Sequence, residues 1–233
     1  MNKKFIFVGI PFAILLLMSA VAAVNMSAPK NINQADMAME REKIINKLLS
    51  PITQNASALG NDEAKITIVE FGDYQCTYCH RFHQDTKDKI IENYVNTGKA
   101  KFLFKDLVIN DLPKDKASSL AAEASYCAAE QGKYWQYHDE IYNNWEGENT
   151  GWITKESLKQ FANNVKIPDL MKFSDCVEGQ KYSNLVQENT IFANSIGLAS
   201  TPNFILYNGT IPLNIPGAHP YEVFDQALKE LSK

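Results

Sequence analysis

Basic charge is scarce in this chain of 233 residues. Lysine and arginine together number 23 against 27 aspartates and glutamates, so the net charge is −4 at pH 7. Because nucleic-acid binding needs a positive field, and no segment is basic enough to supply one, this composition excludes nucleic acid as the expected partner. Internal repeats and low-complexity tracts are also absent, and the length predicts one well-buried domain with an extension.

Long apolar runs are scarce as well, since only residues 5–24 approach the length of a membrane span. Two lysines precede this run, and small residues end it. The pattern predicts a signal peptide over residues 1–24, cleaved near Ala22 or Ala23, or an uncleaved anchor, because about 20 residues reach across about 30 Å of hydrocarbon. Both interpretations leave the lysines inside and place everything after Val24 outside the cytoplasm.

Cysteine is rare, with four residues in the whole chain. Thiols can stay oxidised outside the cytoplasm, and an even number of cysteines permits two disulfides. Cys76 and Cys79 form a C-x-x-C motif, whereas Cys127 and Cys176 have no motif spacing.

The C-x-x-C motif lies where a predicted strand gives way to a predicted helix. Residues 64–71 are short, β-branched and apolar, which is typical of a buried strand, and residues 76–96 have mostly helical spacing up to an Asn-Thr-Gly stop. A second strand is predicted over residues 100–108, which completes a parallel, right-handed β-α-β unit if both strands share a sheet. Residues 25–57, polar around an amphipathic patch, are predicted to be a spacer in the form of a helix or tether.

The rest of the chain predicts a helical insertion followed by a second sheet unit. Residues from about 113 to 197 have alanine, polar and aromatic residues in helical spacing, broken by glycine and proline, and predict three to five helices. An Asn-Gly turn between residues 203–207 and 211–215 predicts a β-hairpin, and Pro212 indicates an edge strand. A last helix is predicted over residues 221–231, so the order is β-α-β, helices, β-β-α.

The position of Cys76 at the start of a helix predicts a reactive thiol. Free backbone N–H groups and the helix dipole favour a thiolate there, so Cys76 is the predicted nucleophile. Cys79 lies one turn later on the same face, is placed to resolve a mixed disulfide on Cys76, and would be the more buried sulfur. The motif therefore predicts a redox-active disulfide, with a structural disulfide or a chance motif as the alternatives.

Three stretches of the chain resemble the DsbA-like branch of the thioredoxin superfamily, from about Leu59 to the C-terminus. They are the lead-in to the motif (residues 64–76), a helical segment (residues 121–139) and the loop Gly-Leu-Ala-Ser-Thr-Pro-Asn-Phe (residues 197–204). The resemblance implies a thioredoxin-like α/β fold, β-α-β plus β-β-α with a helical insertion, over residues 58–233. It also implies a protein-disulfide oxidoreductase that needs no cofactor, acts on exported cysteine-containing proteins and exchanges electrons with a membrane thiol oxidoreductase.

The resemblance assigns roles to residues outside the motif. Glu70, six residues before Cys76, matches the family's acidic residue behind the active site, where a carboxyl of raised pKa passes protons to and from Cys79 through water. Pro202 matches the family's cis-proline, and the backbone of Thr201 would bind an extended substrate. Without the resemblance, Glu70 would be interpreted as a solvated glutamate at a strand end and Pro202 could equally be an ordinary loop proline.

Relatives of this type often link the remaining two cysteines, so the resemblance implies a structural disulfide between Cys127 and Cys176. A second exchanging pair or two buried free thiols are the alternatives. Thr77 stands where the family often has proline. Because the residues between the motif cysteines tune thiolate stability, the choice among oxidase, reductase and isomerase stays open.

A different class of function is also compatible with the motif. Residues 76–80 match the C-x-x-C-H pattern of c-type haem attachment. The two motif cysteines, His80 and His83 also share one helical face, so an exported metal-binding or haem-binding electron-transfer protein is the alternative function. One helix cannot easily wrap an ion, and the strand before the motif and the proline loop far beyond it favour thiol exchange.

Overall fold

Residues 34–51 and 58–233 are described in the computed structural model. The predicted signal peptide or anchor over residues 1–24, and the spacer residues 25–33 and 52–57, lie outside this part of the chain. Within the described ranges, no helix combines the length and the apolar character that crossing a membrane requires.

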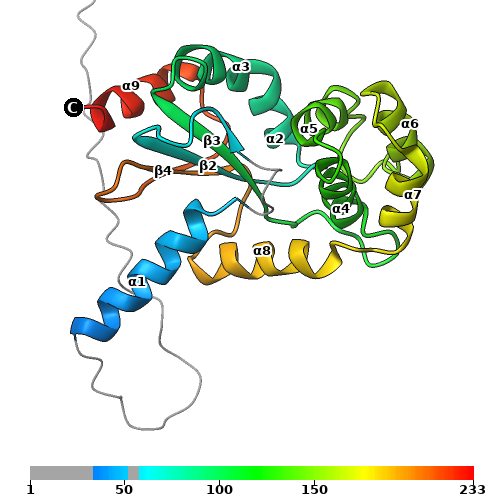
Figure 1. Cartoon of the computed structure of the whole chain (residues 1–233), viewed down its shortest axis with the longest axis horizontal. Helices are drawn as coiled ribbons and strands as arrows, with labels where there is room; N and C mark the ends of the chain where they lie inside the picture. The colour runs from blue at the N-terminus through cyan, green and yellow to red at the C-terminus, as the bar shows by residue number, and fades with distance from the viewer. Residues whose placement is uncertain (1–33, 52–57) are drawn as a thin grey trace, which may run out of the picture.

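A five-stranded mixed sheet lies at the centre of the folded part (Figure 1). Its strands are β1 (Ala58–Leu59), β2 (Ile66–Gly72), β3 (Ala100–Asp106), β4 (Asn203–Tyr207) and β5 (Leu213–Pro216). They follow the spatial order β1-β3-β2-β4-β5, in which β2 and β3 are parallel and the other neighbours antiparallel. The predicted β-α-β unit is therefore confirmed, and β5 is an edge strand, as Pro212 indicated.

The central strand β2 is buried along its whole length. Its sequence carries apolar side chains on both faces, which a strand covered by helices on both sides requires. Ile66 and Ile68 belong to the hydrophobic cluster on one face, and Val69 and Phe71 to the cluster on the other. Because side chains alternate along a strand, Glu70 shares the face of Ile66 and Ile68, which is the face toward the helix that follows the motif.

Helices cover both faces of the sheet, and further helices stand beside it (Figure 1). The helices of the sheet unit are α1 (Gln34–Leu49), α2 (Thr77–Phe82), η1 (His83–Lys87), α3 (Asp88–Ile90), η2 (Ile91–Val95) and α9 (Tyr221–Leu231). The insertion contributes α4 (Ala117–Ala129), α5 (Tyr134–Asn143), α6 (Lys155–Asn164), α7 (Leu170–Glu178) and α8 (Ser183–Ser195). The helical elements from α2 to η2 are continuous and form the helix predicted after the motif.

Two hydrophobic clusters join helices to the sheet. On one face, Phe82 and Ile90 of the helix after the motif pack with Phe224 of α9 against the sheet. On the other face, Leu48 of α1 and Phe192 of α8 pack against it. Figure 1 accordingly shows α3 and α9 on one side of the sheet and α1 and α8 on the opposite side. The fold is thioredoxin-like with a helical insertion, as predicted.

Helix α1 occupies part of the chain that was predicted to be a spacer. Its last turn packs onto the sheet, where Leu48 is only 2% exposed. Lys105 of β3 donates a hydrogen bond to the carbonyl of Ser50, just beyond the helix, at 2.8 Å. Met37 and Met39, in the first half of α1, are exposed. The end of this segment thus belongs to the fold, because a few apolar residues at its C-terminal turn are enough to dock it.

The insertion has a core of its own that continues beneath the motif. A disulfide joins Cys127 of α4 to Cys176 of α7 across a sequence separation of 49 residues. The surrounding cluster of buried residues also includes Tyr74, Cys76 and Cys79. The motif therefore lies at the junction between the sheet unit and the insertion.

Candidate active site

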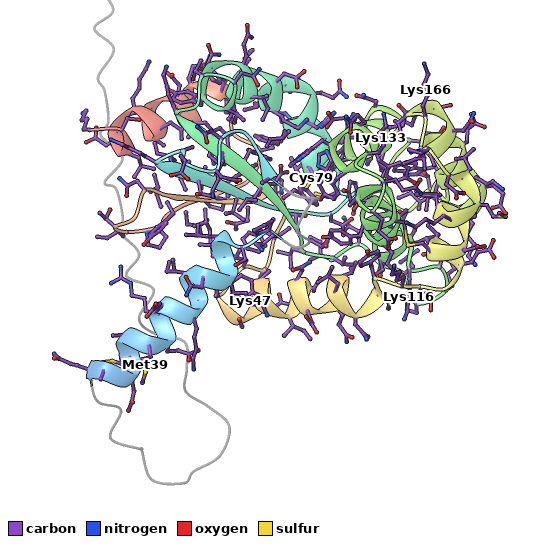
Figure 2. All side chains as sticks on the ribbon, in the orientation of Figure 1. Met39, Lys47, Cys79, Lys116, Lys133 and Lys166 are labelled. Carbon is purple, nitrogen blue, oxygen red and sulfur yellow. A yellow bond between two sulfur atoms is a disulfide. The ribbon has the colours of Figure 1, made fainter. Side chains whose placement is uncertain are left out.

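The motif cysteines occupy unequal positions at this junction, where Figure 2 labels Cys79. Cys76 directly precedes α2 with an extended backbone (φ −66°, ψ 123°), and Cys79 lies one turn inside the helix. Both thiols are free. Cys76 is 5% exposed and Cys79 is fully buried, so Cys76 is the sulfur nearer to solvent.

The two thiols also differ in acidity. A hydrogen bond from the Cys79 thiol lowers the pKa of Cys76 to about 7, against the effect of burial and with help from the Cys79 and Tyr78 amides. Burial raises the pKa of Cys79 well above its usual value, and the neighbouring Cys76 raises it further. At neutral pH Cys76 is therefore present in part as a thiolate, while Cys79 keeps its proton.

The loop before β4 brings Thr201 and Pro202 to the motif. The peptide bond between them is cis. The Cys76 thiol donates to the carbonyl oxygen of Thr201, with the two atoms 3.5 Å apart. The Pro202 carbonyl accepts a hydrogen bond from the amide of Gly217 at 2.8 Å, which holds the loop to the chain beyond β5. Residues more than 120 positions apart in the sequence thus meet at one sulfur.

Glu70 lies in β2 opposite Phe104 of β3 and is 2% exposed, so it is not a solvated glutamate. Burial raises its pKa to about 8, and although the charge of Lys87 acts to lower the pKa, Cys76 raises it further. Gly72 leaves room beside it, because a Cβ at this position would stand 2.5 Å from the Phe104 ring and 3.4 Å from the Glu70 carboxylate. Glu70 is therefore a buried carboxylic acid at neutral pH, able to release a proton.

Asp73 anchors the turn between β2 and the motif. Its carboxylate accepts hydrogen bonds from the amides of Gln75 (2.8 Å), Ile109 (2.8 Å) and Asn110 (2.9 Å) and from the hydroxyl of Ser118 (2.6 Å). One side chain thus ties together the motif, the chain after β3 and helix α4. This role was not predicted from the sequence, although an aspartate directly after a strand is a common turn signal.

A loop after α5 contacts the motif from the side of the insertion. Trp145 Nε1 donates to the carbonyl of Gln75 at 3.0 Å, and the Asn149 amide donates to the Gln75 side chain at 3.2 Å. The imidazole of His80 stacks on Trp145 with 4.6 Å between ring centroids, and its Nδ1 lies 3.1 Å from the carbonyl of Tyr142. The histidine that haem attachment would need as an iron ligand therefore packs against the insertion.

In the part of the chain that the structure describes, one group has the spacing of a metal site, and it consists of His83, His138 and Asp139. Lys87 Nζ lies 2.6 Å from Asp139 Oδ1, the oxygen that is also 3.0 Å from Nδ1 of His138. This buried ammonium would repel a cation. The motif cysteines and His80 do not join the group, so the ligand set predicted on one helical face does not converge.

The chain matches the protein-family model described as Thioredoxin over residues 53–230. It is similar to disulfide bond formation protein D of Bacillus subtilis, with 27% identity over 165 residues that cover 69% of this chain and 72% of that protein. Among solved structures, it resembles oxidised BdbD from Bacillus subtilis, with a TM-score of 0.69 and 22% identity over 77% of this chain and 94% of that one. It also resembles alpha-DsbA1 from Wolbachia pipientis, with a TM-score of 0.68 and 23% identity over 80% and 95% of the two chains.

Proposed function

We propose a specific reaction for this chain on the premise that it belongs to the DsbA-like branch of the thioredoxin family. The chain is a protein-disulfide oxidoreductase. The proposal is that Cys76 and Cys79 form the redox-active disulfide and insert disulfides into exported proteins. One observation carries it: Cys76, whose pKa is lowered, stands at the start of a helix with its sulfur 3.5 Å from the Thr201 carbonyl.

The name of the Bacillus subtilis relative, a disulfide bond formation protein, favours the oxidising direction. The lowered pKa of Cys76 is compatible with either direction. A fall from 9.0 to about 7 stabilises the reduced pair by roughly 3 kcal/mol at about 1.4 kcal/mol per unit, but a cysteine pKa near 7 is also that of thioredoxin, which acts as a reductant.

The reaction starts from the disulfide form of the pair. A substrate thiolate attacks Cys76 Sγ, the bond between the two cysteine sulfurs breaks, and Cys79 leaves with the electron pair. Glu70, which is protonated below about pH 8, passes its proton through water to the Cys79 thiolate. A second substrate thiolate attacks the substrate sulfur of the mixed disulfide, and Cys76 leaves as a thiolate. The substrate gains a disulfide and the protein takes up two electrons.

Substrate would bind beside the proline loop. An extended segment that pairs with the backbone of Thr201, next to Pro202, places its cysteine against the Cys76 sulfur by strand addition. Reoxidation of the pair requires an electron acceptor, and we propose a membrane thiol oxidoreductase. The apolar run of residues 5–24, as a signal peptide or anchor, and the Cys127–Cys176 disulfide, in a structural role, support a location outside the cytoplasm.

The reduction potential of the pair tests this proposal. Equilibration of the protein with glutathione buffers should give a potential nearer to about −120 mV, the value for DsbA, than to about −270 mV, the value for thioredoxin. Cys79→Ala should abolish the two-electron transition, whereas the double variant Cys127→Ala, Cys176→Ala should retain it. A potential near about −270 mV would contradict the oxidising direction. If the motif pair shows no thiol-disulfide exchange, the proposed function is wrong.

A further inference from the structure

The loop between α5 and α6 places a carboxylate against the residue that follows the reactive cysteine. Thr77, which directly follows Cys76 and begins α2, donates from its hydroxyl to Glu148 Oε2 at 3.2 Å. Both side chains are exposed. The first turn of α2 has no acidic residue of its own and no side-chain cap. The insertion thus supplies the negative charge at this end of the helix, where the dipole favours an anion.

The loop holds this carboxylate in a defined place. Gly147, just before Glu148, has a φ of 113°, a conformation that favours glycine, and its carbonyl accepts a hydrogen bond from Trp152 Nε1 at 2.8 Å. Asn149, just after Glu148, donates its amide to the side chain of Gln75, the residue before Cys76. Both neighbours of Glu148 are therefore fixed by contacts, and one of these contacts reaches the motif itself.

Two different polar groups lie near Cys76. The Thr201 carbonyl stands 3.5 Å from its sulfur, and the pair of Thr77 and Glu148 follows it at the helix start. We propose that Glu148 is a specificity-determining residue, which favours substrate segments that carry a lysine or arginine beside the reacting cysteine. The inference rests on the proposed function, because it concerns the substrate of the same exchange reaction.

The expected size of this preference follows from the exposure of Glu148. An exposed ion pair contributes about 0.2 to 1 kcal/mol, which corresponds to a rate ratio of about 1.4 to 5. Salt weakens such an attraction, since the Debye length falls from about 30 Å at 0.01 M to about 3 Å at 1 M. If the preference for a charged peptide disappears at high salt, Glu148 acts through its charge on the substrate and not only as a structural residue of the loop.

Two matched cysteine peptides test the inference, one with arginine and one with glutamine beside the cysteine. Stopped-flow reduction of the oxidised full-length protein at low salt should be about 1.4- to 5-fold faster with the arginine peptide, and the ratio should approach 1 in 1 M salt. Glu148→Gln should bring the ratio close to 1 at low salt. Thr77→Val, which removes the hydroxyl that holds the carboxylate, should reduce it, and Glu148→Lys should reverse it.

Glu146→Gln is the matched control, because Glu146 is an exposed glutamate of the same loop and should leave the ratio at the wild-type value. An equal ratio in wild type and Glu148→Gln would overturn the inference while leaving the exchange reaction intact. Failure of wild type to react with either peptide would instead overturn the proposed function. Reaction of the wild-type protein with the glutamine peptide therefore distinguishes a failure of the charge preference from a failure of the proposed function.

Discussion

At the scale of single residues, three titratable groups of the site are separated in acidity by their surroundings. The Cys79 thiol donates a hydrogen bond to Cys76, and amides at the helix start add to this effect, so the pKa of Cys76 is lowered to about 7. Cys79 and Glu70 lie deeper, where burial raises the pKa of both groups. The Cys76 sulfur is therefore suited to nucleophilic attack and the Cys79 sulfur to keeping its proton, and Glu70 is a buried carboxylic acid that can release or take up a proton.

The raised pKa of Glu70 predicts a pH-dependent cost to stability. The unfolded chain releases this proton near pH 4.5 and the folded protein near pH 8, so the free energy of unfolding should fall as pH rises between these values and stay level above them. Glu70→Gln should remove this contribution, which is roughly 3 to 5 kcal/mol. Urea unfolding of both proteins from pH 4 to 9 measures the difference, and parallel curves would contradict the prediction.

The same group predicts a pH-dependent rate. Glu70 can protonate the departing Cys79 only while it holds a proton, which is below about pH 8. Reduction of the disulfide form by a small thiol, corrected for the thiolate concentration, should be slower in Glu70→Gln than in wild type at pH 6 and similar in both at pH 9. A rate difference that persists unchanged at pH 9 would show that the substitution acts by another route.

At the scale of elements, the site depends on how a strand, a turn and a helix are joined. β2 ends at Gly72, where a larger residue would collide with Phe104. Asp73 then fixes the turn through four hydrogen bonds, and its backbone carbonyl accepts the amide of Cys76 at 3.0 Å. The helix consequently starts at a fixed point relative to β2, which fixes the position of the Cys76 sulfur relative to that strand.

Removal of the Asp73 side chain should loosen this turn. Asp73→Ala leaves the amides of Ile109 and Asn110 without their partner, so we expect a loss of roughly 2 to 4 kcal/mol in the free energy of unfolding. The matched control is Asp111→Ala, since Asp111 accepts hydrogen bonds from the amide and the hydroxyl of Ser119, and its loss should cost about 1 kcal/mol. Equal losses in chemical denaturation would argue against a special role for Asp73.

At the scale of the whole molecule, the site is shared between the sheet unit and the insertion. Lys87 of η1 is paired with Asp139 of α5 at 2.6 Å, so the helix after the motif is joined to the insertion by a partly buried ion pair. Cys76 and Cys79 belong to the same hydrophobic cluster as the insertion helices α4, α5 and α7. Stability of the insertion therefore contributes to the geometry of the motif.

Removal of the disulfide of the insertion should have a large effect on the stability of the protein and a small effect on the motif. The double variant Cys127→Ala, Cys176→Ala opens a loop of 49 residues and should lower the free energy of unfolding by roughly 4 kcal/mol in the chain-entropy model. The measurement is thermal or urea unfolding of both proteins, with the motif pair in the same redox state. A variant as stable as wild type would show that the bond does not constrain the unfolded chain.

Local patterns in the sequence were enough to predict the order of elements. The apolar strand before Cys76, the helical spacing after it and the Asn-Gly turn before β5 are short-range signals, and each corresponds to an element of the fold. The two-residue strand β1 was missed because it is too short for any periodic pattern. The segment that contains helix α1 was predicted to be a helix or tether serving as a spacer, and its docking was not predicted, because that docking depends on a single buried turn around Leu48.

The sequence by itself determined the motif, the order of the strands along the chain and the likeness that singled out Glu70 and the proline loop. Only the tertiary structure decided which groups distant in sequence pair around the motif and the helix after it: Asp73 with its donors, Lys87 with Asp139, and Glu148 with Thr77 at the helix start. The physical reason is that hydrogen bonds and ion pairs between side chains distant in sequence leave no periodic pattern. They are set by how the insertion packs against the sheet unit, which no local segment encodes alone.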